Sequence, residues 1–406
     1  MGRSVNSIKM YMKNLFVFWD EPLNPVGGGI HRCIINLITF MPQRGYNVKY
    51  IYSKDFYQTF NYETEEGKIQ NIPLKDLGSF LKEQHCDVVL GQEAVFSSTF
   101  TKAFSSISMV DIKFVNQYHN TPLYFQKKLT WDYLKFEWIT THSLKSRLAL
   151  IARGLFYPLW RWNVKRNQNI IYKYNYDNSD VTLLLSEHEK PHLKKMIGEK
   201  DLKKCVVIPN PLSWPEIVST DILKDKQKEV LIVSRIYNSE KRIDLALKVW
   251  RILQDRQLND GWTMRIVGEG IHEAYLKEMT HALGLKNVIW EGRREPLPFY
   301  KRASIFLLTS VVEGWALTLT ESMQTGVVPI AFDSYPAVRS IITDGYDGFI
   351  VPTKNLEILS DRISKLMHDS DTRERMALNG LRSCRRFDVN KIMDQWQNML
   401  DNITNK

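Results

Sequence analysis

Residues 304–332 constrain the fold more than any other part of the chain. Two apolar runs of strand length, 304–309 and 327–332, flank a segment with helical spacing. Gly314 permits a tight turn before that helix, and Gly326 stands where a left-handed helix cap belongs. The order strand, loop, helix, strand predicts a parallel α/β unit. In such a unit the helix N-terminus lies at the carboxyl end of the sheet, where it favours an anion.

Two carboxylates, Glu313 and Glu321, lie eight positions apart across the start of this helix. Eight helical residues rising ~1.5 Å each would span roughly 12 Å, enough to hold a diphosphate between two hydroxylated groups. A carboxylate near a diphosphate is unfavourable unless it accepts hydrogen bonds, so sugar hydroxyls are its natural partners. The spacing alone is equally consistent with two surface glutamates on an ordinary helix.

Length and composition indicate a folded protein of two domains. The 406 residues exceed one ordinary core, and 44% hydrophobic with 25% charged residues describe a soluble chain. The scattered cysteines fit a reducing cytoplasm better than a disulfide scaffold or a zinc ribbon; they are Cys33, Cys86, Cys205 and Cys384. Residues 1–12 lack the apolar segment of a signal peptide, and we expect residues 1–11 to be a disordered extension.

Strands and helices alternate along both halves of the chain, which predicts parallel sheets. In the first half we expect strands at residues 14–19, 48–52, 87–90, 112–117 and 181–185. In the second half we expect them at 229–234, 263–267, 288–291, 304–309 and 327–332. A Pro-rich and then charged stretch between residues 208 and 228 is a plausible domain boundary, and residues 389–400 form an amphipathic helix.

Several polar or glycine-rich positions follow these strands and therefore face a ligand crevice. The triplet Gly27, Gly28 and Gly29 after the first strand lets a ligand approach the backbone, although a triple glycine alone is a weak signal. His119 follows a later strand of the same half, where a lone histidine is more often structural than functional. In the second half, Arg235 and Lys241 are well placed to bind phosphate.

The net charge of +10 is concentrated in residues 127–173, which hold ten Lys or Arg against two acids, together with nine aromatic residues. Basic and aromatic residues interleaved in this way are typical of helices that lie in an anionic membrane interface. The alternative is a pair of ordinary helices whose aromatics enter the core and whose lysines face water. No nucleic-acid recognition motif accompanies the charge, so we expect no nucleic-acid partner.

Two motifs resemble metal sites but are better explained otherwise. The sequence His188-Glu189-Lys190-Pro191-His192 matches the zinc-protease pattern H-E-x-x-H, which needs both histidines on one helical face. Pro191 favours a first helical turn, so the histidines should lie on either side of a helix boundary. Asp369 precedes a helix and is expected to cap it instead of binding a metal.

Taken together, these motifs resemble glycosyltransferase family 4 (glycosyl transferases group 1), retaining enzymes with the GT-B fold of two facing Rossmann-like domains. The family's E-x7-E signature corresponds to Glu313 and Glu321, and its phosphate-binding pair to Arg235 and Lys241. The turn Gly268-Glu269-Gly270, the first-domain glycine loop and Tyr118-His119-Asn120 also match. Two departures are Ala316, where glycine is usual, and Tyr335-Pro336, where a glycine pair is common.

The resemblance implies an α/β chain with a cleft between two parallel-sheet domains. Residues 1–211 would bind the acceptor, 212–385 the nucleotide-sugar, and 386–406 would be a helix packing back towards the first domain. The catalytic residues would be Arg235 and Lys241, which bind the diphosphate, Glu313, which binds the sugar hydroxyls, and His119 on the acceptor side. Glu321 would bind the ribose. The remaining donor-binding positions would be Gly28, Gly29, Gly268, Glu269, Gly270, Gly314, Trp315, Ala316, Leu317 and Thr318.

The implied activity is that of a retaining hexosyltransferase that moves a sugar from a UDP- or GDP-sugar to a glycan or lipid-linked acceptor, as in cell-surface polysaccharide or lipopolysaccharide synthesis. No metal or other cofactor is expected, because cations and a helix terminus can stabilise the leaving diphosphate. The protein would be cytoplasmic, and peripheral on the inner face of the cell membrane if residues 127–173 bind lipid. The alternatives are a sugar-nucleotide epimerase of the same fold and a non-catalytic protein that binds sugar-nucleotide or nucleic acid.

Overall fold

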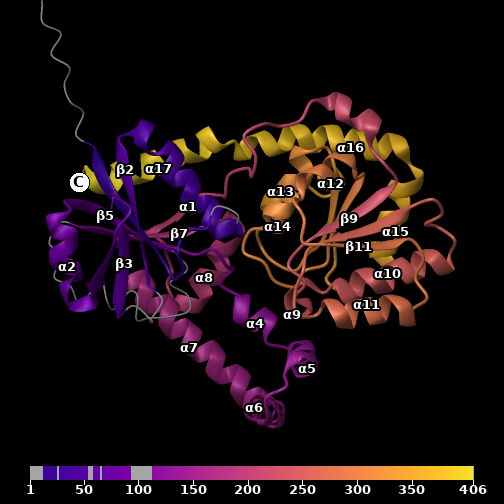
Figure 1. Cartoon of the computed structure of the whole chain (residues 1–406), viewed down its shortest axis with the longest axis horizontal. Helices are drawn as coiled ribbons and strands as arrows, with labels where there is room; N and C mark the ends of the chain where they lie inside the picture. Colours follow the sequence, from indigo (N-terminus) through magenta and orange to yellow (C-terminus); the bar gives the residue numbers. More distant parts are fainter. Residues whose placement is uncertain (1–11, 25–26, 54–57, 65, 93–111, 406) are drawn as a thin grey trace, which may run out of the picture.

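The computed structural model describes residues 12–24, 27–53, 58–64, 66–92 and 112–405 (Figure 1). The extension expected at residues 1–11 lies outside the described residues. Two sheets with their helices lie side by side, and we call them the first and second domains (Figure 1). The residue boundaries proposed for these domains stay a prediction.

The first domain contains an eight-stranded sheet in the order β4-β3-β2-β1-β5-β6-β7-β8. Its strands are β1 (Lys13–Trp19), β2 (Tyr46–Tyr52), β3 (Thr59–Glu63), β4 (Ile69–Pro73), β5 (Cys86–Gln92), β6 (Lys113–Gln117), β7 (Val181–Leu184) and β8 (Cys205–Val207). All neighbours from β2 to β8 pair in parallel, as predicted for this half, although β8 was not among the predicted strands. The antiparallel pair β3 and β4 extends one edge and was not predicted.

The helices of the first domain include one from the far end of the chain. They are α1 (Gly29–Phe40), α2 (Leu74–Glu83), α8 (Lys190–Ile197) and α17 (Val389–Thr404), with the short 3-10 turns η1 (Pro42–Arg44) and η3 (Glu187–Glu189). The chain crosses from the second domain to the first between α16 and α17, and α17 (yellow) lies along the first domain (Figure 1). Ile392, Trp396 and Leu400 of α17 are buried in one core cluster with Leu15 and Val17 of β1, so the last helix completes the first domain's core.

The second domain contains a six-stranded parallel sheet in the order β11-β10-β9-β12-β13-β14. Its strands are β9 (Glu229–Val233), β10 (Thr263–Val267), β11 (Val288–Gly292), β12 (Ile305–Leu308), β13 (Val328–Phe332) and β14 (Phe349–Val351). Its helices and 3-10 turns are η4 (Thr220–Asp225), α9 (Asn238–Lys241), α10 (Ile243–Asp255), α11 (Glu273–Ala282), α12 (Leu297–Arg302), α13 (Leu317–Gln324), α14 (Val338–Ile341), α15 (Leu356–His368), α16 (Ser370–Ser383) and η5 (Cys384–Phe387).

Amphipathic spacing explains how these helices cover the second sheet. In α10, Ile243, Leu247 and Trp250 recur at helical spacing, are fully or almost fully buried, and pack in one cluster with Val230 and Ile232 of β9. The strands are apolar on both faces because helices cover both sides of the sheet, as is usual for a parallel sheet. This packing fixes the carboxyl ends of β9, β10, β11 and β12 at one edge.

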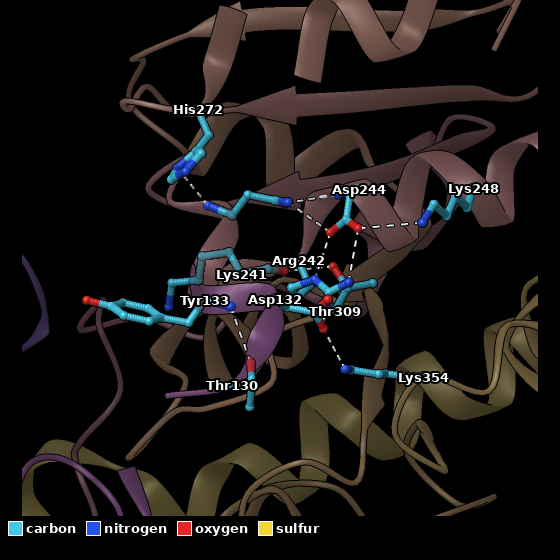
Figure 2. Close-up of polar contacts among 11 residues, drawn as sticks. Thr130, Asp132, Tyr133, Lys241, Arg242, Asp244, Lys248, His272, Thr309 and Lys354 are labelled. Carbon is cyan, nitrogen blue, oxygen red and sulfur yellow. Dashed lines mark hydrogen bonds and ion pairs between the residues drawn. The ribbon is translucent and has the colours of Figure 1, made fainter. Parts of the chain in front are cut away.

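Four helices between β6 and β7 form a long excursion that reaches the second domain (Figure 1). They are α4 (Tyr124–Lys128), α5 (Trp131–Thr140), α6 (Leu144–Leu155) and α7 (Tyr157–Asp177). Figure 2 shows Asp132 of α5 between two cations of the second domain, 2.6 Å from Nη1 of Arg242 and 2.7 Å from Nζ of Lys354. The ring nitrogen Nε2 of His272 lies 3.0 Å from the carbonyl oxygen of Phe136. Helix α5 of the first domain is therefore bound to the second domain by ion pairs and a hydrogen bond.

Candidate active site

A cavity of about 590 Å³ opens between the two domains. Its walls come from the loops after β1, β9, β10, β11 and β12 and from the start of α13, so it lies at the carboxyl ends of parallel strands, where α/β folds bind ligands. Most of the predicted site residues line it: Gly28, Gly29, Arg235, Lys241, Gly268, Glu269, Glu313, Trp315, Ala316, Leu317, Thr318 and Glu321. His119, Gly270 and Gly314 do not line it.

Glu321 projects from α13 and is almost fully buried, with 2% of its side chain exposed. Its Oε1 accepts a hydrogen bond of 2.7 Å from Ser213 Oγ and is ion-paired with Arg32 of α1. Arg32 belongs to the first domain, so this ion pair crosses the cleft. A buried carboxylate needs such partners, and a ligand hydroxyl could replace them only by supplying comparable hydrogen bonds.

Glu313, the other of the two predicted carboxylates, forms an ion pair with Lys241. The Lys241 ammonium lies 2.5 Å from Glu313 Oε1, and 17% and 15% of the two side chains are exposed. The Lys241 carbonyl also accepts a hydrogen bond of 3.0 Å from the Thr309 hydroxyl, a contact that connects the end of α9 to the end of β12. The Lys241 cation is therefore held at a defined position in the wall of the cavity. Figure 2 shows Lys241 beside Thr309.

Arg235 is the more exposed of the two predicted phosphate ligands, with 67% of its side chain accessible. It is anchored by Glu240, whose Oε2 lies 3.2 Å from Arg235 Nη2. Burial of Glu240 favours its neutral form, but the attraction of Lys128 at 2.6 Å outweighs this and lowers the pKa of the carboxyl. Glu240 thus stays ionised and orients the guanidinium at the cavity wall.

Three glycines allow close backbone contacts around the site. Gly268 has a φ of +141°, and a β-carbon there would lie 1.9 Å from the Ser234 carbonyl oxygen. At Gly270 it would lie 2.4 Å from the Ile236 carbonyl oxygen. At Gly314 it would lie 1.6 Å from the carbonyl oxygen of His119, which belongs to the first domain. Gly314 is therefore a point at which the backbones of the two domains lie in close contact.

His119 is buried and is not among the residues that line the cavity. Burial lowers the pKa of its imidazole to about 3, and its Nε2 is hydrogen-bonded to Oε1 of Gln92. The ring is consequently neutral at physiological pH. It can therefore form hydrogen bonds but is not charged and does not serve as a general acid. Its proposed role on the acceptor side stays a prediction.

Sequence reasoning missed three cations that line the cavity: Arg32, Arg293 and Arg294. With Arg235 and Lys241 they make five cations against the three acids Glu269, Glu313 and Glu321. Arg293 and Arg294 directly follow β11, and Arg32 lies in the first turn of α1 after the glycine loop, so all three occupy ligand-facing ends that the sequence could have revealed. The excess positive charge suits a polyanionic ligand.

Two residues of the cavity wall also carry a buried polar atom without a protein partner. Ser234 Oγ and Trp315 Nε1 have no hydrogen-bond partner among the described residues. Helix α13 begins at Leu317 without a side-chain cap from Ala316. Buried polar atoms normally find a partner, so these groups are available to a ligand.

The two motifs that resemble metal sites have the predicted local structure. His188 lies in η3 and His192 in α8, with Pro191 in the first turn of that helix, so a helix boundary separates the two histidines. Asp369 caps α16, its carboxylate accepting a hydrogen bond of 2.9 Å from the Thr372 amide. Within the described residues, no three His, Cys, Asp or Glu side chains form a group that could bind a metal.

Comparison with known proteins agrees with this geometry. Residues 216–382 match the sequence model of the family described as glycosyl transferases group 1. A GalNAc-α-(1->4)-GalNAc-α-(1->3)-diNAcBac-PP-undecaprenol α-1,4-N-acetyl-D-galactosaminyltransferase of Campylobacter jejuni is 26% identical over 52% of this chain and 58% of its own length. The amylovoran biosynthesis glycosyltransferase AmsD of Erwinia amylovora is 24% identical over 56% of this chain and 63% of its own length. This chain thus aligns with less than two thirds of either relative.

Among solved structures, the pneumococcal O-GlcNAc transferase GtfA in complex with UDP and GlcNAc superposes with a TM-score of 0.68. The superposition covers 98% of this chain and 100% of that one, at 12% identity, and therefore bears on the fold alone. It agrees with two facing α/β domains and a cleft between them. The chain has the GT-B fold, and its residues 216–382 are similar to the family of glycosyl transferases group 1.

Proposed function

We propose that this protein is a retaining glycosyltransferase of family 4 that moves a sugar from a UDP- or GDP-sugar to a hydroxyl of a glycan or lipid-linked acceptor. The observation that carries the proposal is the interdomain cavity. It brings two carboxylates, Glu313 and Glu321, together with an excess of cations at the N-terminus of α13. This combination suits a diphosphate flanked by two hydroxylated groups.

The donor would lie mainly against the second domain. Glu321 would accept hydrogen bonds from the ribose hydroxyls, which requires Arg32 to release at least part of its contact with that carboxylate. Arg235 and Lys241 would bind the diphosphate, and Glu313 would bind sugar hydroxyls. The turn at residues 268–270 would border the base.

The amides of Leu317 and Thr318, at the uncapped start of α13, would add donors to the phosphate. The unpartnered Ser234 hydroxyl and Trp315 indole N–H are two further donors at the wall of the cavity. Together these groups would surround the diphosphate with fixed dipoles and cations before the reaction begins.

The reaction would retain the anomeric configuration. As the bond between the anomeric carbon and the diphosphate oxygen breaks, the acceptor oxygen attacks from the same face and its proton passes to the leaving phosphate. Negative charge grows on the diphosphate, and the positioned cations stabilise it in the transition state. We therefore propose that the transfer needs no metal and no strong protein base.

Acceptors of cell-surface polysaccharide or lipopolysaccharide synthesis are the class we propose, in the cytoplasm. The names of the two relatives support this choice, since one acts on an undecaprenol-linked glycan and the other belongs to amylovoran biosynthesis. The clearest alternative is a sugar-nucleotide epimerase, which would rearrange the donor without any acceptor.

Calorimetric titration with UDP, GDP and ADP tests the donor site, using the wild type, Glu321→Ala and Arg235→Ala. We expect one nucleotide to bind selectively and both variants to weaken it. Absence of binding to the wild type would overturn the donor-site assignment. Transfer is then tested with the matching labelled nucleotide-sugar. Label that moves to a glycan with its anomeric configuration retained, as read by NMR, supports the proposal, and acceptor-independent epimerisation contradicts it.

A further inference from the structure

Exposed apolar side chains are concentrated on the projecting helices α6 and α7. Ten of the sixteen large hydrophobic side chains that are exposed in the described part of the chain lie between residues 131 and 170. Six of them define what we call the α6–α7 surface: Leu144, Leu148, Ile151, Leu155, Leu159 and Trp162. Figure 1 shows that these helices extend away from both sheets, with α6 at the tip.

The members of the α6–α7 surface that lie on α6 share one face of that helix. On α6 its members are spaced by four, three and four residues, which places them on one side of the helix. Leu150, on another side of α6, is buried and holds the helix in place. By contrast, Leu144 and Leu155 are 74% and 75% exposed. The outward side chains are thus not part of the protein's own core, and the arrangement differs from ordinary helices whose apolar residues point inwards.

Positive charge surrounds this apolar face. No Asp or Glu occurs from residue 138 to residue 176, whereas seven Lys or Arg do. Only Lys173 of these seven forms an ion pair within the described residues. Several of the others stack on aromatic rings: Arg147 lies 5.0 Å from the Trp138 ring and Arg166 5.6 Å from the Trp162 ring. Their charge is therefore not neutralised by the protein.

We propose that the α6–α7 surface docks the protein on an anionic membrane. Leucine and tryptophan side chains would enter the interface between headgroups and acyl chains, and the surrounding cations would bind lipid phosphates. A helix of twelve residues is too short to span a bilayer, and no helix among the described residues is long and apolar enough to do so. Docking would therefore be peripheral.

The charge pattern argues against a second copy of the chain as the occupant. A twofold interface would place the same cation-rich, acid-free surface opposite itself, and like charges at an interface are costly. An anionic lipid surface is complementary to both the apolar and the basic parts.

A cavity beside the surface fits the same partner. It has a volume of about 390 Å³ and opens between α4 and α7. Apolar atoms of Phe125, Leu129 and Trp162 line it together with the cations Arg161 and Lys165. Such a site offers charged groups for a lipid phosphate next to apolar walls for the adjoining chain.

Vesicle flotation of the full chain tests the proposal without any reference to catalysis. Vesicles of phosphatidylcholine alone are compared with vesicles that also hold about 30% phosphatidylglycerol, at low and at high salt. We expect the wild type to float only with the anionic vesicles, and less so at high salt. A wild type that stays unbound to both vesicles, or binds both equally, overturns the proposal.

Two double variants separate the apolar and the electrostatic parts. Leu148→Ser with Leu155→Ser removes exposed apolar groups, and we expect it to weaken vesicle binding about tenfold or more. Arg161→Gln with Lys165→Gln removes two cations, and at about fivefold for each cation the low-salt affinity should fall about 25-fold. Because these side chains are at the surface, circular dichroism should show unchanged folding.

Matched controls remove similar groups elsewhere. Ile271→Ser changes a residue that is 63% exposed on the second domain, and Lys200→Gln with Lys286→Gln removes two exposed cations. These variants should bind vesicles like the wild type. If they weaken binding as much as the α6–α7 variants do, the surface is not the docking site. If instead the wild type ignores vesicles and is a dimer that the leucine variant dissociates, the surface joins two copies and the proposal is wrong.

Discussion

Replacement of Gly314 by alanine should force the two domains apart. A β-carbon at this position would lie 1.6 Å from the His119 carbonyl oxygen and 2.8 Å from the Asn120 Cα, both in the first domain. Real β-carbons keep at least 3.0 Å from such atoms. Increasing the distance to the His119 carbonyl oxygen from 1.6 Å to 3.0 Å requires the loop before α13 to move by at least 1.4 Å. Both obstacles are backbone atoms and cannot rotate away.

A displacement of this size at the cleft should reduce sugar transfer much more than nucleotide binding. Misplacing reacting groups by about 1 Å can cost about 100-fold in rate, so we expect kcat/KM of Gly314→Ala to fall about 100-fold. Arg235, Lys241 and Glu321 all belong to the second domain, so the Kd for the nucleotide should change less than about threefold. Small-angle X-ray scattering should report a larger radius of gyration for the variant.

The matched control is Gly154→Ala in α6, where the nearest atom to the new β-carbon is a Trp131 ring carbon at an ordinary 3.7 Å. This change should leave the transfer rate unaltered and stabilise the helix by about 1 kcal/mol. The reasoning is refuted if Gly314→Ala retains transfer within about threefold of the wild type and scatters identically.

Three further outcomes are expected. Arg235→Ala and Lys241→Ala should each lower kcat about 100-fold, while EDTA should leave the rate unchanged; restoration of an EDTA-treated enzyme by a divalent metal would contradict this. Burial in the folded protein lowers the pKa of Lys226 from 10.5 to about 7. Between pH 7 and pH 10.5 this lysine is therefore more protonated in the unfolded chain than in the folded protein. Unfolding free energy should therefore rise by about 2 kcal/mol from pH 7 to pH 9 relative to Lys226→Met, measured by urea denaturation. Asp132→Asn should weaken the contact between α5 and the second domain, because it removes the charge that pairs with Arg242 and Lys354. Small-angle X-ray scattering should detect the resulting domain movement, and an unchanged scattering profile would argue against a role of Asp132 in holding the domains together.

The buried parallel strands could be predicted from the sequence because each is a short apolar run between turn residues. The predicted strand at residues 229–234 and the observed β9 (Glu229–Val233) differ by one residue, for example. Strands β3 and β4 could not be recognised in this way. β3 (Thr59–Glu63) buries only Phe60 and β4 (Ile69–Pro73) only Ile72, so an edge hairpin leaves little apolar signal.

Some residues of the candidate site could likewise be predicted from the sequence, and others could not. The sequence could identify groups that one loop or helix brings together, such as Glu313 and Glu321, because their spacing along the chain carries the signal. It could not identify Arg32 as the partner of Glu321, since 289 positions separate them and only the assembled cleft brings them close. The burial of His119 likewise depends on the packing of the complete fold, so its lowered pKa could not be foreseen from its place after a strand.

Helix α5 gives the proposed membrane surface a fixed relation to the donor side of the cleft. Asp132 and Glu137 of α5 contact the second domain, Asp132 through Arg242 and Glu137 through a hydrogen bond of 3.1 Å from Ser239. Helix α6 begins only a few residues after α5 ends. A bilayer held by α6 and α7 would therefore be oriented relative to both domains and not to the first alone. Since opening the cleft would have to break the α5 contacts or move α6 with the second domain, domain movement and the angle at the membrane would be mechanically linked.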